Sequence, residues 1–300
     1  MQPLRIADTR EMTREEWLAA RTKGIGGSDI AAICGFTPWA SPMSVFLDKI
    51  GAIPPAEENE KMMWGKKLEA MIAAEFKERN AGVKVQKINA VLRHPECPIF
   101  LANIDRKITN QDGQPGVLEC KNTNQFALKN WDQEREEAPE YVLAQLQWYL
   151  GVTGYSYGYA AALVGGQSYR QVYSPRDEDL IKLMQDKALS FWQLVETRTP
   201  PPIDGSDASA DVLKILYPTT EKGKGIELPT EALGWIFQYE AAHSAASENE
   251  KAKKEAANNL KALMGEAEIG IVGDRKVTLK TVSKKEHMVK ATSYRQLSIK

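Results

Sequence analysis

Carboxylate and lysine side chains recur two residues apart in this sequence, a spacing that puts both on one face when the segment is a β-strand. The pattern occurs four times: Glu75-Phe-Lys77, Asp105-Arg-Lys107, Glu119-Cys-Lys121 and Asp274-Arg-Lys276. The first lies in a predicted helix, where positions two apart do not face each other, and the last lies at the tip of a predicted hairpin. Only the middle two fall in segments with the pattern of core strands.

The stretch "GVLECKN", residues 116–122, places Glu119 and Lys121 on one face of a strand and Leu118 and Cys120 on the other. Buried charges are costly unless they are paired or bind a metal, so these two form either a structural ion pair or part of a site. Asp105, in "IFLANIDRKI", belongs to the preceding strand. Pairing of the two strands would bring Asp105 close to Glu119 and Lys121.

Two carboxylates and a lysine at one place on a sheet suit metal-assisted hydrolysis. Carboxylate oxygens are ligands of Mg²⁺, which usually takes one or two of them together with water and substrate phosphate. A bound metal lowers the pKa of water, and a lysine can hold that water or help to deprotonate it. A cross-strand salt bridge is the commoner explanation of such triplets, so the triplets alone leave both interpretations open.

The elements that must position these residues are predicted from periodicity and capping signals. Thr13 and Glu16 form a capping box for a first helix that ends near residues 23–24, and "GIGGSD" is a glycine-rich turn with Ser28 as the N-cap of a helix from Asp29. Further helices are predicted in "SVFLDKIG" and over residues 61–79, 139–152, 176–197 and 229–264. Strands are predicted over residues 83–93, 99–109, 115–121, 155–164 and 167–173, with a terminal hairpin turning at Gly273-Asp274.

The bulk composition indicates an ordinary soluble globular protein. The chain has 300 residues, 43% of them hydrophobic and 26% charged, with a formal net charge of −1, so any basic surface must be local. Three widely spaced cysteines, no apolar signal region and no apolar run long enough to span a bilayer predict a cytoplasmic protein. The triple proline at residues 200–202 and the polar stretch after it predict a domain over residues 1–200 and an extension over residues 201–300.

The order of these motifs resembles that of the PD-(D/E)xK nuclease superfamily. Asp105 is followed by Glu119-Cys120-Lys121 and then by a helix with "AQLQWYL", where Gln145 and Tyr149 match the Gln-x-x-x-Tyr element of the exonuclease branch. Upstream, "RTKGIGGSDIAAICGFTPWASPMSVFLDKIG" and "WGKKLEAMIAAEF" resemble the opening segments of the YqaJ-type phage recombination exonucleases, related to lambda exonuclease. The resemblance runs over residues 10–200. It departs at Ile104, where the superfamily name has proline, and at Asn122, where many relatives have a hydroxyl residue.

The resemblance implies a fold and a set of roles. The fold class is α/β (α+β), with a central mixed β-sheet flanked by helices, a restriction-endonuclease-like core and a C-terminal extension of helix and β-hairpin. The implied metal is Mg²⁺, with Mn²⁺ able to substitute. The implied metal ligands are Asp105, Glu119 and the Cys120 carbonyl. Lys121 would position the attacking water, Glu69 would aid a second metal or its water shell, and Gln145 would orient Lys121 or the water, with Gln147 as its rival.

A second group of residues concerns the substrate. Arg21 lies seven residues before Ser28, a spacing at which the family holds the 5′-phosphate of the degraded strand, although a plain helix cap beside a surface arginine is the alternative. Met62 or Met63 could separate a terminal base pair, with core packing as their commoner role. Trp39 is another DNA-facing candidate.

The resemblance therefore predicts a Mg²⁺-dependent 5′→3′ exonuclease acting on duplex DNA ends with a 5′-phosphate. It would leave 3′ single strands for recombination by single-strand annealing, in a bacterial host or phage-infected cell. A ring-shaped homotrimer and a phage single-strand annealing protein as partner are implied as well. The alternatives are a related endonuclease or 3′-acting nuclease, and a DNA-binding module without catalysis.

Overall fold

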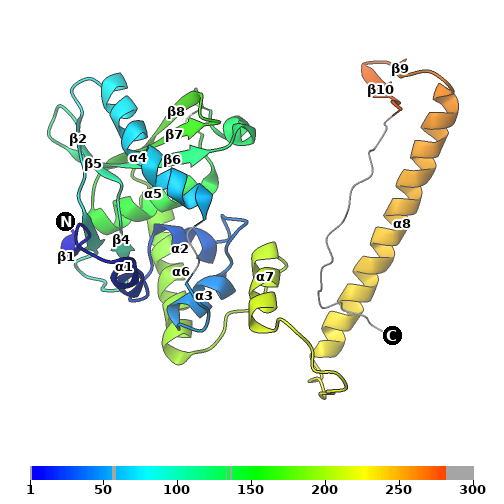
Figure 1. The fold of residues 1–300 in the computed structure, drawn as a ribbon, viewed down its shortest axis with the longest axis horizontal. Coiled ribbons are helices and arrows are strands. Elements are labelled where there is room, and N and C mark those ends of the chain that lie inside the picture. Colours follow the sequence, from blue (N-terminus) through cyan, green and yellow to red (C-terminus); the bar gives the residue numbers. More distant parts are fainter. Residues whose placement is uncertain (1, 56–58, 133, 136, 282–300) are drawn as a thin grey trace. The chain divides into compact units, whose positions relative to one another are not determined.

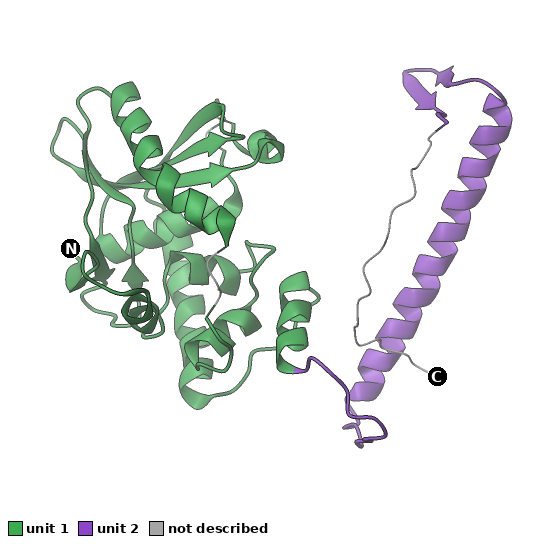
Figure 2. Cartoon of the chain, viewed as in Figure 1, with its two compact units in different colours: residues 1–216 green, residues 217–300 purple. Residues whose placement is uncertain are grey.

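The computed structural model describes residues 2–55, 59–132, 134–135 and 137–281 (Figure 1). Figure 2 shows that the chain forms two compact units, residues 1–216 and residues 217–300. The helices of unit 1 are α1 (Arg14–Arg21), α2 (Gly27–Ile33), α3 (Pro42–Lys49), α4 (Glu60–Arg79), a 3₁₀ helix η1 (Gln125–Asn130), α5 (Glu140–Thr153), α6 (Glu178–Thr197) and α7 (Asp207–Leu216). Its strands are β1 (Leu4–Asp8), β2 (Lys84–Gln86), β3 (Ala90–Arg93), β4 (Leu101–Ala102), β5 (Arg106–Thr109), β6 (Pro115–Thr123), β7 (Tyr157–Val164) and β8 (Ser168–Pro175).

The central sheet of unit 1 has five strands in the order β2-β5-β6-β7-β8. Strands β6 and β7 are parallel, and the other neighbours are antiparallel. Parallel neighbours need a crossover connection, which α5 supplies between β6 and β7. This mixed sheet, with helices packed on it, confirms the predicted fold class.

The alternation of side chains along β6 divides the core into two layers. Leu118 packs in a cluster with Ile72 and Phe76 of α4, and Cys120 lies against the same cluster. Val117 packs in the other cluster with Leu146 of α5. The two layers place α4 and α5 on opposite faces of the sheet, so Glu119 and Lys121 face α5.

The predicted start of α1 is confirmed, whereas α2 begins before Asp29 and α3 begins at Pro42, before the predicted "SVFLDKIG". Thr13 caps α1 with a complete capping box, since its side chain accepts from the Glu16 amide and Glu16 accepts from the Thr13 amide. Helix α2, however, begins at Gly27 with Gly26 as its N-cap. The Asp29 carboxylate accepts from the Gly26 amide at 2.9 Å, so the cap comes from Asp29 and leaves the Ser28 hydroxyl exposed.

Two predicted strands are interrupted, and the predictions of continuous strands over residues 83–93 and 99–109 are wrong. The first breaks at Asn89, whose φ of 44° lies in the left-handed region. The chain then leaves the central sheet for a second sheet with the order β1-β3-β4. The other strand breaks between β4 and β5, so Asp105 lies immediately before β5 instead of inside a strand.

Helix α7 was not predicted, nor was β1, which pairs with β3. Helix α7 begins inside the stretch predicted as a polar boundary, and it packs against α3 with Ala208 and Val212 buried. Unit 1 therefore reaches residue 216. The predicted division into an exonuclease domain over residues 1–200 and an extension over residues 201–300 stays a prediction.

Within its described residues, unit 2 contains α8 (Ala232–Met264) and a hairpin of β9 (Ile269–Val272) and β10 (Arg275–Thr278). Gly273, with a φ of 55°, lies in the turn, as predicted. Within the part of the chain that is described, none of the helices combines the length and the apolar character that crossing a bilayer requires.

Candidate active site

The structure brings Asp105, Glu119 and Lys121 together on the α5 face of the sheet. The Lys121 ammonium lies 2.7 Å from Glu119 Oε1, and the backbone amide of Cys120 donates to Asp105 Oδ2 at 2.8 Å. Arg106 and Leu118 form the last registered pair of β5 and β6, and Asp105 and Glu119 are the residues directly beyond this pair. The side chains of Asp105, Glu119 and Lys121 thus lie on one face of the sheet. A chance occurrence of the sequence pattern could equally have placed them on opposite faces.

Burial and mutual charge dominate the electrostatics of this cluster. Burial, together with the charges of Glu119 and Glu69, raises the pKa of Asp105 well above its usual range. Burial also raises the pKa of Glu119, and the Lys121 charge offsets only part of this rise. For Lys121, burial favours the neutral amine, but the charges of Glu119 and Asp105 outweigh it and raise the pKa. One ammonium group is therefore not enough to neutralise two carboxylates, and the cluster favours a further cation.

Helix α5 holds Lys121 through Gln145. Gln145 Oε1 accepts a hydrogen bond from Lys121 Nζ at 2.8 Å, and the Gln145 amide donates to the Tyr149 hydroxyl at 2.9 Å. Gln147, the rival in the prediction, faces the other way and bonds to Ser174, Pro175 and Asp177. The structure thus places Gln145, and not Gln147, beside Lys121.

Glu69 comes from α4 on the opposite face, and its carboxylate is held by cations. Its Oε1 pairs with the Arg106 guanidinium, which also donates to the Asp105 carbonyl, and lies 3.8 Å from Lys87 Nζ. Sequence reasoning missed Arg106, which lies directly after Asp105 and bonds to both the Glu69 carboxylate and the Asp105 backbone carbonyl. Glu69 is thus linked to the cluster through Arg106, and its negative charge lies near the carboxylates of the cluster.

The predicted phosphate-binding residues also meet. Arg21, at the end of α1, donates to the Ser28 hydroxyl at 3.0 Å, and its guanidinium lies over the Trp17 ring at 4.8 Å from the ring centre. The same guanidinium contacts Asp29 at 3.2 Å. Asp29 in turn pairs at 2.7 Å with Lys49, whose side chain is completely buried.

This pairing determines the charge of Asp29 beside Arg21. Burial alone would raise the pKa of Asp29, but the charges of Lys49 and Arg21 outweigh it, and the pKa is lowered. The cations Arg21 and Lys49 and the Asp29 carboxylate sum to a net charge of +1. Because Lys49 is completely buried, Arg21 is the cation that faces solvent. Sequence reasoning missed Lys49, whose position in the apolar stretch "SVFLDKIG" was the available signal.

The close packing of α2 on α5 joins the two groups of residues. A Cβ atom added to Gly27 would lie 2.6 Å from Gln145 Cγ and 2.8 Å from Tyr149 Cε1, so only glycine permits this approach. Ser28 follows Gly27 directly, and Gln145 holds Lys121. The Arg21 group and the carboxylate cluster therefore lie close together, and the charges of both act on Tyr149.

Comparisons with known proteins give the family. A family model described as the YqaJ-like viral recombinase domain matches residues 16–156. The chain is also 40% identical over 281 residues to the uncharacterized protein YqaJ of Bacillus subtilis (strain 168), with 92% of this chain and 86% of that protein covered. The chain belongs to the YqaJ family. The predicted family resemblance is confirmed.

Solved structures related to this YqaJ-family chain share its fold. The crystal structure of the alkaline exonuclease LHK-Exo from Laribacter hongkongensis matches with a TM-score of 0.50 and 20% identity, over 61% of this chain and 93% of that one. The LHK-Exo complex with dAMP matches with a TM-score of 0.51, 21% identity and the same coverage. The shared fold accounts for almost all of LHK-Exo, whereas the YqaJ-family chain has further residues.

A divalent cation fits the carboxylate cluster of this YqaJ-family site by the chemistry of its donors. Glu119 Oε2 is buried and has no hydrogen-bond partner among the described residues, which leaves a costly orphan oxygen in the metal-free protein. The described residues contain no group of three or more His, Cys, Asp and Glu side chains placed to hold a metal. A cation here would thus use two carboxylates with backbone and water oxygens, a set that Mg²⁺ accepts.

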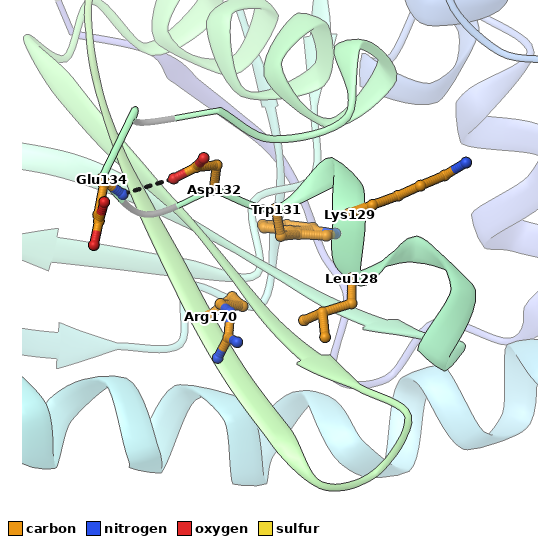
Figure 3. Close-up of a pocket in the computed structure, with 6 residues that line it drawn as sticks. All are labelled: Leu128, Lys129, Trp131, Asp132, Glu134 and Arg170. Atoms are coloured by element: carbon orange, nitrogen blue, oxygen red, sulfur yellow. Dashed lines mark hydrogen bonds between the residues drawn. The ribbon is translucent and has the colours of Figure 1, made fainter. Parts of the chain in front are cut away.

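A separate hollow of about 460 Å³ lies beyond the end of β6 (Figure 3). It is lined by Leu128, Lys129, Trp131, Asp132, Glu134 and Arg170. Asp132 accepts from the Glu134 amide at 3.0 Å, and charges of both signs border the hollow. None of the residues predicted for catalysis or phosphate binding lines it, so it is distinct from the carboxylate cluster.

Proposed function

We propose that this protein is a Mg²⁺-dependent 5′→3′ exonuclease that degrades one strand of duplex DNA from its ends. The observation that carries the proposal is the convergence of Asp105, Glu119 and Lys121, with Gln145 bonded to Lys121. Membership of the YqaJ family and the fold shared with an alkaline exonuclease support the same reaction class.

Asp105, Glu119 and the Cys120 carbonyl are the proposed metal-holding groups. When bound there, a divalent cation supplies a Lewis acid and lowers the pKa of water, which is the chemistry that phosphodiester hydrolysis needs. Mn²⁺ is expected to substitute for Mg²⁺, because the proposed donors are all oxygen atoms.

The protein's own groups supply charge and orientation. Lys121, charged and partly open to solvent, orients the attacking water and offsets the negative charge that grows on the phosphoryl oxygens. Gln145 positions Lys121 by fixing the direction of its ammonium group. Glu69, held by Arg106, adds negative charge near Asp105 and so favours a cation or its water shell.

The polarity of the reaction is assigned to the Arg21 group. The Arg21 guanidinium and the Ser28 hydroxyl offer N–H and O–H donors next to the catalytic cluster, with a net positive charge after Asp29 is paired. A terminal 5′-phosphate is a dianion that this arrangement suits, and a fixed phosphate would place the first phosphodiester at the carboxylates.

The biological role follows from these assignments. The product is a 3′ single-stranded overhang, a substrate for homologous recombination by single-strand annealing, and we propose a phage-type annealing protein as the partner. A homotrimeric ring around DNA in the cytoplasm suits a chain with a net charge of −1, because basic residues need only line the channel.

The decisive experiment uses a 5′-phosphorylated linear duplex with Mg²⁺ and two matched variants. Asp105→Asn is expected to lower hydrolysis by more than about 10²-fold, whereas Asp112→Asn, an exposed residue in the turn between β5 and β6, is expected to leave it unchanged. The product must be mononucleotides from the 5′-strand, and a circular duplex must stay intact. Cutting of the circle would favour the endonuclease alternative, and full activity of Asp105→Asn would show that the site is misplaced.

A further inference from the structure

Trp39 is an exposed aromatic side chain at the edge of the site. It lies in the loop between α2 and α3 with 66% of its surface exposed, while Trp131 and Trp148 are buried in the core. Its ring is nevertheless fixed, because it packs edge-on against Tyr141 with 4.9 Å between ring centres and 77° between ring planes. An exposed indole held by a second aromatic ring presents a flat apolar face to solvent.

Tyr141 connects this ring to the catalytic cluster. It lies on α5 four residues before Gln145 and eight before Tyr149, so the three share one face of the helix. Tyr141 also feels the charge of Lys121: burial raises the pKa of Tyr141, and the nearby Lys121 charge partly offsets the rise. Trp39 thus contacts Tyr141, and Tyr141 lies about 6 Å along the helix from Gln145, which holds Lys121.

We propose that Trp39, supported by Tyr141, is a stacking platform for the nucleobase of the nucleotide whose phosphodiester lies at Lys121. This inference rests on the proposed nuclease function and names a group that positions its substrate. Every base has a π-face, so the platform accepts all four bases and gives no sequence preference. A stacked base fixes the rotation of its nucleotide, which sets the phosphodiester in line with the attacking water.

The test compares an end that carries a base with an end that lacks one. The substrates are two 5′-phosphorylated duplexes that differ only in the terminal nucleotide, deoxyadenosine or a tetrahydrofuran abasic residue. For Trp39→Ala we expect kcat/KM on the base-bearing end to fall about 5- to 150-fold and on the abasic end to change less than about twofold. Trp39→Phe should restore most of the loss, because it keeps an aromatic face.

The matched control is Trp235→Ala in unit 2, whose ring is 69% exposed. This variant should treat both ends as the wild type does. Equal losses on the two ends with Trp39→Ala, or no loss on either, would overturn the platform.

Failure of the nuclease proposal is detected separately, as a wild-type protein that cleaves neither duplex. The platform is then tested by the equilibrium Kd of the two duplexes in EDTA, measured by fluorescence anisotropy. Preference of the wild type for the base-bearing end, lost in Trp39→Ala, supports it. Equal Kd values for the two duplexes in the wild type refute it.

Discussion

Gln145 accepts a hydrogen bond from the Lys121 ammonium group at 2.8 Å and donates one to the Tyr149 hydroxyl at 2.9 Å. Tyr149 is buried, and burial raises its pKa well above the usual range, so its hydroxyl keeps its proton. The Lys121 ammonium can only donate, so it turns the Gln145 oxygen toward itself and leaves the Gln145 NH₂ group to donate to Tyr149. The Gln145 oxygen accepts from the ammonium, so a side chain of helix α5 holds the Lys121 ammonium group in one direction.

Replacement of Gln145 should impair turnover more than binding. In Gln145→Leu, Lys121 keeps its pairing with Glu119 but loses its second contact, so we expect kcat to fall about 10- to 100-fold with a much smaller change in KM. Gln147→Leu is the matched control from the same helix, because Gln147 faces β8 and the start of α6. The control should lower the melting temperature and leave kcat unchanged. A Gln145→Leu enzyme with wild-type kcat would remove Gln145 from the site.

The carboxylate cluster should destabilise the metal-free protein. Asp105 lies beside Glu119 and is buried enough to raise its pKa, so Asp105→Asn removes a disfavoured charge and keeps an oxygen for the Cys120 amide. In EDTA we expect this variant to melt higher than the wild type by about 2–4 °C, as a gain of about 1 kcal/mol gives in a chain of this size. Mg²⁺ should raise the melting temperature of the wild type and not that of Asp105→Asn.

The Asp112→Asn variant should melt and respond to Mg²⁺ as the wild type does. Lower stability of Asp105→Asn in EDTA would show that the Asp105 carboxylate strengthens the metal-free fold. The cluster would then be a structural ion pair.

Strand β6 could be predicted well from the sequence because its side chains alternate between the two faces of the sheet. Leu118 and Cys120 pack toward α4 and Glu119 and Lys121 face α5, as period-two alternation requires. The spacing of Gln145 and Tyr149 on one helix face was equally readable. Local patterns of this kind depend only on residues a few positions apart.

The breaks in the two predicted strands and the side-chain pairs between distant residues could not be predicted from local sequence patterns. Residues 83–93 and 99–109 keep a strand-like composition through Asn89 and Asn103, yet the chain changes sheets at these points. The partner of Glu69 is Arg106, 37 residues away, and nothing local favours Arg106 over nearer lysines. Such pairings arise only when tertiary packing brings α4 beside the start of β5.

Arg21 should decide the preference for a 5′-phosphate. Arg21→Gln removes the guanidinium that contacts Ser28, so we expect the ratio of kcat/KM for 5′-phosphorylated over 5′-hydroxyl ends to fall by about 10-fold or more, the loss of one charge-assisted hydrogen bond. Lys23→Gln removes the same charge two residues later, from an exposed side chain, and should keep the ratio. An unchanged ratio in Arg21→Gln would favour an enzyme that does not start at 5′ ends.

The end of unit 1 should lie after α7. A chain of residues 1–216 keeps Val212 in the core, whereas a chain of residues 1–200 loses this contact and exposes the α3 surface beneath α7. Burial of one such side chain is worth about 1.5–3 kcal/mol, so the shorter chain should melt several degrees lower in a thermal scan. Equal melting of the two chains would place the boundary at residue 200.

The Asp29–Lys49 pair should make stability depend on acid. The folded-state pKa of Asp29 is lowered, so the pair stabilises the protein fully above the unfolded-state pKa, about 3.9, and the contribution is lost as the pH falls through the lower folded-state value. Asp29→Asn leaves the buried Lys49 ammonium without its carboxylate, at a cost of about 3–5 kcal/mol near pH 7.

Urea unfolding at a series of pH values measures this dependence. The difference in unfolding free energy between the wild type and Asp29→Asn should be largest above about pH 4–5 and shrink as the pH falls toward 2, because the wild-type carboxyl then takes up its proton. The double variant Asp29→Asn/Lys49→Met leaves no unpaired charge, and it should be more stable than Asp29→Asn alone. A difference that stays constant from pH 7 to pH 2 would mean that the interaction does not depend on the Asp29 charge.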